Sequence, residues 1–449
     1  MTRHSLELWG GIECTLNRVG DCYHDQLKFA GHDARPDDLA AIASLGIRTL
    51  RYPVLWEEVA PRSLSRPQFG RSDARLRRLQ AAGIEPIVGL LHHGSGPRYT
   101  SLLDAAFPRK LSTFAGLVAR RYPWVHRFTP VNEPLTTARF SALYGHWYPH
   151  ARDDRSFARA LLNQVWGTVL AMQAIRREVP DAQLIQTEDL GWVRSTPDLA
   201  YQAAFENERR FLSLDLLLGR VTPQHPLHGY LLESGIGRQE LELLADNPCP
   251  PDVVGLNYYV TGERYLDSRI GLYPAHVIGG NGRAVYADVE AVRVCPDGLR
   301  GPGALLIDAH ARLGVPLAVT EAHLAGAHED HARWLSYVWS GAEQARDAGV
   351  PLQAVTAWAL LGSHGWDRLV TQGACSYEAG AFELRGGELV ETPYAGFLRA
   401  VAGGTARVVD GGWWRSEERL IYRHAELAWP QELEAEPELF AAARLERPL

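Results

Sequence analysis

The chain has 449 residues, of which 46% are hydrophobic and 22% are charged, and its formal net charge is -7. This composition is typical of a globular protein with a large core, and the acidic balance argues against a protein that binds the phosphate backbone of nucleic acids. Five scattered cysteines form no C-x-x-C motif, which argues against both a disulfide framework and a cysteine-rich zinc site.

The N-terminal sequence MTRHSLELWGG lacks the apolar segment of a signal peptide. No run along the chain approaches the roughly 18 continuous apolar residues that a membrane span needs. We therefore expect a cytoplasmic protein that has neither a membrane partner nor a nucleic-acid partner.

One pattern recurs along the chain: a short apolar, β-branched or aromatic run, then a loop, then an amphipathic helical stretch. The runs do not alternate between polar and apolar residues, as is typical of strands buried on both faces of a parallel sheet. The eight runs are residues 6–14, 47–54, 84–93, 126–133, 183–189, 253–259, 316–322 and 354–362. Helical patterns cover residues 36–46, 72–83, 108–123, 156–180 and 329–349. Ser72 is the expected N-cap of the second of these helices.

Eight strand–helix units predict a closed (β/α)8 TIM barrel, which is an α/β fold. The alternative, a doubly wound open sheet, would want a G-x-G-x-x-G turn after the first strand, and GGIECTLNR does not provide one. Because a minimal barrel needs only about 250 residues, the surplus predicts extended βα loops. The longest insertion, 260–300, is expected to form a loop or small hairpin over one barrel face. We assign residues 1–403 to the barrel. Residues 404–449 form an appendage that packs on the barrel or links to a partner.

Polar side chains follow nearly every predicted strand. Active sites of barrels lie at the carboxyl ends of the strands, so these residues are expected to share one rim. They are Glu13, Asn17, Arg51, His92, His93, Asn132, Glu133, Glu188, Asn257, Tyr259, Glu321, Trp358, Trp366 and Asp367.

Two of these residues, Glu133 in FTPVNEP and Glu321 in VTEAH, follow the fourth and seventh strands. Glycoside hydrolysis with retention needs one carboxylic acid that protonates the leaving oxygen and one carboxylate that attacks the anomeric carbon, about 5–5.5 Å apart. His323, His328 and His331 fit no tetrahedral metal pattern. We therefore expect catalysis by the two glutamates, with no metal and no other cofactor.

The segments around both glutamates resemble glycoside hydrolase family 1, the β-glucosidase family, within its clan of (β/α)8 enzymes. TPVNEP resembles the acid/base motif, and PLAVTEAH resembles the nucleophile strand. The segments LWGGIECTLNRVGD, LRYPVLWEEVAP, GIEPIVGLLHHGSGP, VVGLNYY and AWALLGSHGWDRLV resemble further family strands in the family's order, so that the likeness spans roughly residues 6–400.

This resemblance implies that Glu133 is the acid/base and Glu321 the nucleophile. Together with the strand-end positions, it indicates a set of substrate-binding residues. They are Asn17, Arg51, His93, Asn132, Asn257, Tyr259, Trp358, Trp366 and Asp367. Asn132 is expected to hold the sugar's 2-hydroxyl, and Arg51 and Tyr259 to keep Glu321 ionised.

The sequence departs from the family pattern at three places. Gly94 stands where the family has Trp, Ala322-His323 follows the nucleophile in place of Asn-Gly, and Gly365 replaces the glutamate that grips the sugar's 4- and 6-hydroxyls. Either Asp367 substitutes for that glutamate or the sugar lacks a 6-hydroxyl. Glu13 and Glu188 are ambiguous, because each can bind sugar hydroxyls or pair with Arg18 or another base.

The sequence thus predicts a retaining, exo-acting β-glycosidase that works by double displacement on a small-molecule or oligosaccharide β-glycoside. Two alternatives stay open: an endo-glycosidase or transglycosidase of the same clan, and a sugar-binding or regulatory barrel whose activity has decayed. Barrels that resemble this one also occur joined to sugar-nucleotide-modifying domains, so the appendage is a candidate link to such a domain.

Overall fold

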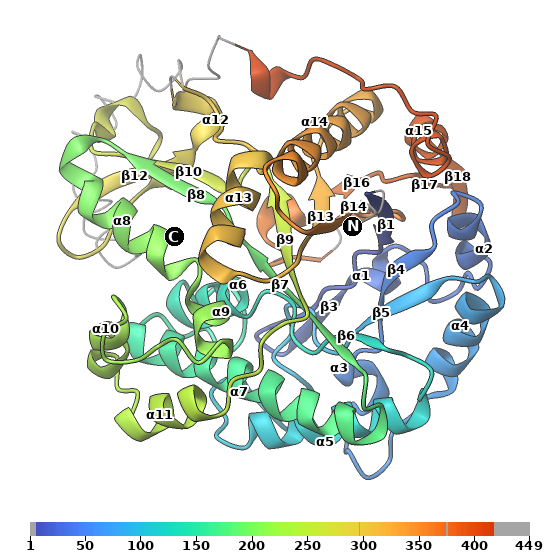
Figure 1. Ribbon diagram of the computed structural model, residues 1–449, viewed down its shortest axis with the longest axis horizontal. Helices are drawn as coiled ribbons and strands as arrows, with labels where there is room; N and C mark the ends of the chain where they lie inside the picture. The colour runs from blue at the N-terminus through green and yellow to red at the C-terminus, as the bar shows by residue number, and fades with distance from the viewer. Residues whose placement is uncertain (1–5, 296, 374–375, 417–449) are drawn as a thin grey trace.

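The computed structural model describes residues 6–295, 297–373 and 376–416. All eight predicted strand runs form strands, and they close into a barrel in the order β1-β14-β13-β9-β7-β6-β5-β4, each neighbouring pair parallel (Figure 1). The predicted TIM barrel is therefore confirmed. Its strands are β1 (Glu7–Gly11), β4 (Thr49–Pro53), β5 (Glu85–Gly89), β6 (Arg127–Thr129), β7 (Gln183–Asp189), β9 (Val253–Tyr259), β13 (Leu317–His323) and β14 (Leu352–Ala357).

Helices surround the barrel, as Figure 1 shows. The longer ones are α4 (Gly70–Ala81), α5 (Phe107–Arg121), α7 (Asp154–Glu178), α8 (Ala200–Arg209), α11 (Arg238–Asp246), α13 (Pro302–Leu313), α14 (His328–Asp347) and α15 (Pro393–Ala402). The shorter ones are α1 (Gln26–Phe29), α2 (Asp38–Ala43), α3 (Trp56–Val59), α6 (Pro134–Ala138), α9 (Leu212–Leu217), α10 (His228–Glu233) and α12 (Ala291–Val294). The predicted cap at Ser72 is wrong, because α4 starts two residues earlier and Phe69 precedes it without a side-chain cap.

The barrel interior is filled by side chains. One buried layer takes a residue from each of six strands, and its members pack against one another apart from the main core. They are Trp9, Ile87, Ile185, Val253, Ala318 and Ala354. Such filled layers make a barrel a packed core rather than a pore, so the chemistry must lie at the strand ends.

The insertion after β9 is larger than the predicted loop or hairpin. Strands β10 (Glu263–Asp267), β11 (Ile278–Gly280) and β12 (Val285–Glu290) join β8 (Trp192–Ser195) in a four-stranded sheet of order β11-β12-β10-β8. Figure 1 shows this sheet beside α8, at one side of the barrel. Strand β8 pairs in parallel with β10, so two βα insertions far apart in sequence build one structure.

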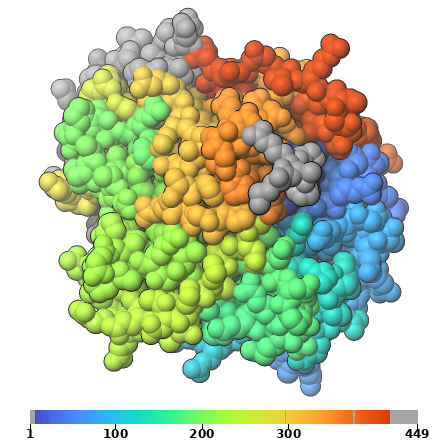
Figure 2. All heavy atoms as spheres, viewed as in Figure 1, coloured from blue at the N-terminus to red at the C-terminus, as the bar shows by residue number. Residues whose placement is uncertain are grey.

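The described part of the appendage lies against the barrel's outer layer. The ring of Trp414 is buried, with its centroid 5.1 Å from that of Trp334 and 6.2 Å from that of Tyr337, both in α14. Figure 2 shows the described C-terminal residues, in red, on the surface beside α14, in orange. The rest of the predicted appendage, 417–449, lies outside the described residues. None of the described helices is both long and apolar enough to cross a membrane.

Candidate active site

The loop after β6 places Glu133 at the barrel mouth in an unusual backbone conformation. Glu133 has φ +43°, in the left-handed region that non-glycine residues rarely adopt. Its backbone N–H donates to the carbonyl of Thr187 (3.2 Å), and that of Asn132 donates to the carbonyl of Leu91 (2.9 Å). Hydrogen bonds to the chain segments on both sides thus stabilise this strained backbone conformation. In proteins, strained residues of this kind cluster at functional sites.

Glu321, in β13, is held by one cation and one hydroxyl. The Arg51 Nη1 donates to its Oε1 at 2.7 Å, and the Tyr259 hydroxyl donates to its Oε2. Burial raises the pKa of Glu321, whereas the Arg51 guanidinium and the Tyr259 hydroxyl oppose that rise. Burial, with the Glu321 charge, also raises the pKa of Tyr259 well above its ordinary value, so the phenol stays a proton donor. These two partners therefore favour the carboxylate form of Glu321 against the effect of burial.

Glu133 has a different environment. Its Oε1 accepts from Asn257 Nδ2 at 2.5 Å, and its Oε2 lies 3.8 Å from His93 Nε2. Burial raises the pKa of Glu133 well above its ordinary value, and the charges of Glu321 and Asp189 add to the rise. Burial, reinforced by Arg51, lowers the pKa of His93 to about 3, so His93 gives no positive charge to offset this. The surroundings of Glu133 consequently favour its protonated form more strongly than those of Glu321 favour protonation there.

Two threonines that sequence reasoning missed fix the amides beside the glutamates. The Thr187 hydroxyl donates to Asn132 Oδ1 (2.8 Å), which also accepts from Arg51 Nη2 (2.7 Å). The Thr320 hydroxyl donates to Asn257 Oδ1 (2.6 Å). Both amide oxygens are thereby occupied, so each amide presents its N–H2 group to the site. The signal for these threonines was their position one residue before a strand-end glutamate.

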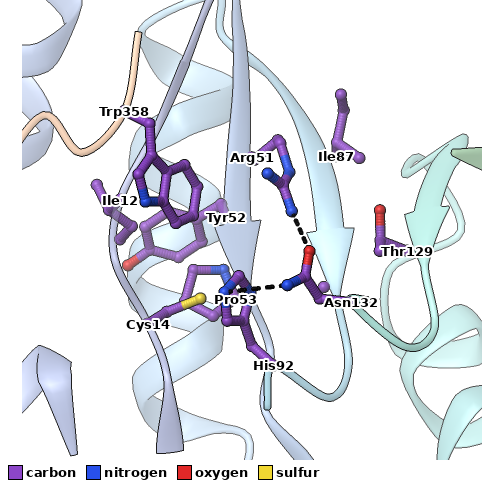
Figure 3. Close-up of a pocket in the computed structure, with 11 residues that line it drawn as sticks. Ile12, Cys14, Arg51, Tyr52, Pro53, Ile87, His92, Thr129, Asn132 and Trp358 are labelled. Atoms are coloured by element: carbon purple, nitrogen blue, oxygen red, sulfur yellow. Dashed lines mark hydrogen bonds between the residues drawn. The ribbon is translucent and has the colours of Figure 1, made fainter. Parts of the chain in front are cut away.

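Trp358 forms one wall of the pocket below these groups. Its ring stacks on His92, with centroids 5.6 Å apart and planes 7° apart, and the Arg51 guanidinium carbon lies 4.9 Å from its centroid. Figure 3 shows Arg51 and Asn132 pointing toward one another across this pocket, with His92 next to Asn132. A Cβ at Gly11 would lie 2.4 Å from the Trp358 ring, so the indole occupies this place only because residue 11 is glycine.

Asn17 and Trp366 lie near the mouth, but Asp367 points elsewhere. Asn17 is fully buried, and its Nδ2 donates to the carbonyl of Val370 in the loop after β14 (3.1 Å). The Trp366 ring centroid is 5.7 Å from that of His93. The Asp367 side chain is 50% exposed and hydrogen bonds to Ser376. The structure therefore does not place Asp367 where the missing side chain at residue 365 would act.

The two ambiguous carboxylates have different partners. Glu188 accepts from the backbone N–H of Leu135 (2.8 Å) and from the Ser213 hydroxyl (2.6 Å), so it supports the start of α6. Glu13 accepts from the backbone N–H of Thr15 (2.8 Å) and from the Trp366 indole N–H (3.0 Å). Neither pairs with Arg18, which bonds to Asp21.

His323, the last residue of β13, makes contacts to the loops after β14. His323 Nδ1 lies 3.0 Å from the Trp358 carbonyl, and its Nε2 lies 2.8 Å from Glu378. Within residues 6–295, 297–373 and 376–416, no three His, Cys, Asp or Glu side chains gather in a way that would hold a metal ion.

Comparisons with known proteins agree on the fold. No family model matches the sequence. A 6-phospho-β-glucosidase of Dickeya chrysanthemi is 24% identical over 272 residues, so the chain spans about half the length (56%) of this curated relative. A family 1 β-glucosidase of Thermotoga maritima superimposes with a TM-score of 0.71 at 15% identity, over 90% of this chain and 99% of that one. The β-glucosidase of the same organism in complex with deoxynojirimycin gives 0.70 at 16%, over 89% and 98%. The chain thus has the barrel fold of family 1 β-glucosidases.

Proposed function

We propose that the protein is a retaining, exo-acting β-glycosidase. The observation that carries the proposal is the contrast between its two rim glutamates. Glu321 is bonded to Arg51 and Tyr259, whereas Glu133 is buried beside Asn257 and the neutral His93, and neighbouring carboxylates raise its pKa further. Two carboxyl groups whose surroundings separate their pKa values are the usual arrangement of an acid and a nucleophile. The relatives named above, a 6-phospho-β-glucosidase and β-glucosidases, support the same reaction class.

In the proposed first step, Glu133 donates its proton to the glycosidic oxygen while Glu321 attacks the anomeric carbon. The bond between that carbon and the leaving oxygen breaks, and an ester between Glu321 and the sugar forms. In the second step, Glu133, now ionised, takes a proton from water, and the oxygen of that water displaces Glu321. Asn132 offers an N–H to the sugar's 2-hydroxyl, a contact that gains strength as charge develops in the transition state.

Exo action is favoured by the aromatic groups that enclose the mouth. The Trp147 ring lies 5.3 Å from His93 and 6.4 Å from Trp366, and its indole N–H donates to the carbonyl of Leu369 at 2.7 Å. Such a wall suits one terminal sugar better than a long polymer running through. The predicted cytoplasmic location and the link to a sugar-nucleotide-modifying domain stay proposals.

Azide rescue tests the two catalytic roles. We expect wild type to hydrolyse at least one of a panel of 4-nitrophenyl β-glycosides: glucoside, galactoside, xyloside, fucoside and 6-phosphoglucoside. Glu321→Gly should lose this activity and recover it with azide, giving the α-glycosyl azide, because azide attacks opposite the leaving group. Glu133→Ala, with the 2,4-dinitrophenyl substrate, should instead give the β-azide, because two displacements occur.

The same anomer from both variants would refute the assigned roles. A wild type that is inactive on the whole panel would favour the sugar-binding barrel. An active wild type whose products are mainly longer glycosides would favour the transglycosidase.

A further inference from the structure

Glu13 is a buried carboxyl next to the catalytic pair that the proposed reaction does not use. It follows β1 and is only 4% exposed. Burial raises its pKa, and its charge in turn acts on Glu321 and Tyr259, where it opposes ionisation. Glu13 lies two residues beyond the end of β1, so it belongs to the same strand-end rim as Tyr259 at the end of β9 and Glu321 near the end of β13.

Its hydrogen-bond donors are the Thr15 backbone N–H and the Trp366 indole N–H, and the Cys14 backbone N–H and the Thr15 hydroxyl also stabilise its charge. Among the described residues, no cation lies within salt-bridge distance of it. The cation nearest in sequence, Arg18, bonds to the Gly20 carbonyl and to Asp21, and its guanidinium carbon lies 3.9 Å from the Tyr148 ring centroid. A carboxylate has about four lone-pair directions, and apart from the Trp366 indole all of the donors to Glu13 come from residues near it in the chain. Burial of a carboxylate without a neighbouring cation costs free energy. A ligand whose hydroxyl groups donate hydrogen bonds to the carboxylate would reduce that cost.

The position of Glu13 distinguishes it from a structural carboxyl. Glu188 bonds to the backbone of Leu135 and to Ser213, both in elements that pack on the barrel. Glu13 instead bonds to the Trp366 indole, in the loop after the neighbouring strand β14, and that ring lies against His93. Glu13, Trp366 and His93 thus form a connected polar and aromatic group at the rim of the barrel.

The loop that carries Trp366 has no acidic side chain of its own directed at this group. Residue 365 is a buried glycine with φ +70°, and Asp367 is half exposed and bonds to Ser376. Among the described carboxyl groups discussed above, Glu13 is therefore the one available to accept from the sugar at this face of the mouth.

We propose that Glu13 is a specificity-determining residue whose carboxylate accepts hydrogen bonds from hydroxyl groups of the bound glycone. The proposal rests on the β-glycosidase function proposed above. In this arrangement the Trp366 indole N–H orients the carboxylate, and a sugar with a hydroxyl donor at this position is preferred over the same sugar without it.

Binding of non-hydrolysable substrates tests the proposal without turnover. Wild type and Glu13→Gln would be titrated by calorimetry with phenyl 1-thio-β-D-glucoside, with its 3-deoxy, 4-deoxy and 6-deoxy analogues, and with the corresponding thioxyloside. Glutamine keeps the shape but loses the charge and replaces one acceptor oxygen with a donor group. We expect the variant to bind the parent thioglucoside about 10- to 100-fold more weakly, the range for a hydrogen bond to a charged group. For one deoxy analogue the two proteins should bind almost equally.

Glu263→Gln is the matched control, because Glu263 is also buried and accepts hydrogen bonds from the Tyr258 hydroxyl and from the backbone N–H of Gly301, away from the mouth. It should change thermal stability without changing the pattern of affinities. Three results would each overturn the assignment of Glu13. They are an equal loss of affinity by Glu13→Gln for every compound, no loss of affinity for any compound, and no binding of any thioglycoside by wild type. Selective loss by Glu13→Gln in a protein that hydrolyses none of the 4-nitrophenyl glycosides would support the Glu13 assignment and refute the hydrolase function.

Discussion

Replacement of Arg51 by methionine should displace the pH dependence of the enzyme, because this guanidinium is the charge that stabilises ionised Glu321 across 2.7 Å. Arg51→Met keeps much of the side-chain volume and removes the charge. The pKa of Glu321, which burial already raises, should rise further. Since the nucleophile must be ionised, the acidic limb of kcat/KM should move to higher pH.

The size of the shift follows from the geometry. Two unit charges about 4 Å apart, at an effective dielectric constant of about 20, interact by about 4 kcal/mol. This corresponds to about 3 pH units. A shift of that size would carry the pKa of Glu321 toward or past that of Glu133. The proton would then sit on the nucleophile, and activity should fall across the whole profile rather than at low pH alone.

The assay is kcat/KM against pH for the best 4-nitrophenyl glycoside, with two controls. Arg51→Lys keeps the charge and should keep the acidic limb close to that of wild type. Arg75→Met removes another buried guanidinium, one that bonds to His32 outside the mouth, and should lower stability without moving the profile. An acidic limb within 0.5 pH units, a margin of about 0.7 kcal/mol, of wild type in folded Arg51→Met would refute the electrostatic account of Glu321.

Three further variants test separate parts of the site. Glu133→Gln should reduce kcat/KM about 10²- to 10⁴-fold for alkyl glycosides and far less for 2,4-dinitrophenyl glycosides, because an activated leaving group needs no acid; equal losses would refute its role as acid. Tyr259→Phe removes a hydrogen bond to the nucleophile's carboxylate and should lower kcat/KM about 10- to 100-fold, and steady-state kinetics showing no change would contradict that role. Gly11→Ala puts a Cβ 2.4 Å from an indole carbon and should cost about 1–3 kcal/mol in denaturant unfolding, whereas Gly70→Ala, which meets nothing within 4 Å, should be neutral or stabilising.

The barrel could be predicted because its signal is local and repeated. Each strand is an apolar run buried on both faces. Eight such runs alternating with helices predict a closed barrel, even when the contacts between individual residues are not known. The four-stranded sheet could not be predicted in this way, since β8 is short, half-buried and pairs with β10 about 70 residues later. The strand that pairs with β8 is determined by the overall fold and cannot be recognised from the sequence of β8 itself.

The position of the two rim glutamates was predictable, but their surroundings were only partly so. Strand-end position and motif identified Glu133 and Glu321, and they drew attention to Arg51 and Tyr259. Glu13 stayed ambiguous because its indole partner lies 353 residues away. Asp367 was assigned by proximity in sequence, and the structure shows its side chain half exposed and bonded to Ser376. Orientation of a side chain in a loop depends on backbone angles that the sequence does not display.

Glu133 has a left-handed backbone conformation, and His93 has a similar one with φ +55°. At both residues the conformation required at the site opposes the stability of the fold. Each such residue costs about 1–3 kcal/mol, a strain that glycine would relieve. Selection for stability alone would therefore favour glycine at residue 133, whereas the proposed role as general acid would favour glutamate there. Efforts to make this protein more heat-resistant should leave this rim unchanged and seek their gains in the outer helices, where no reaction depends on strain.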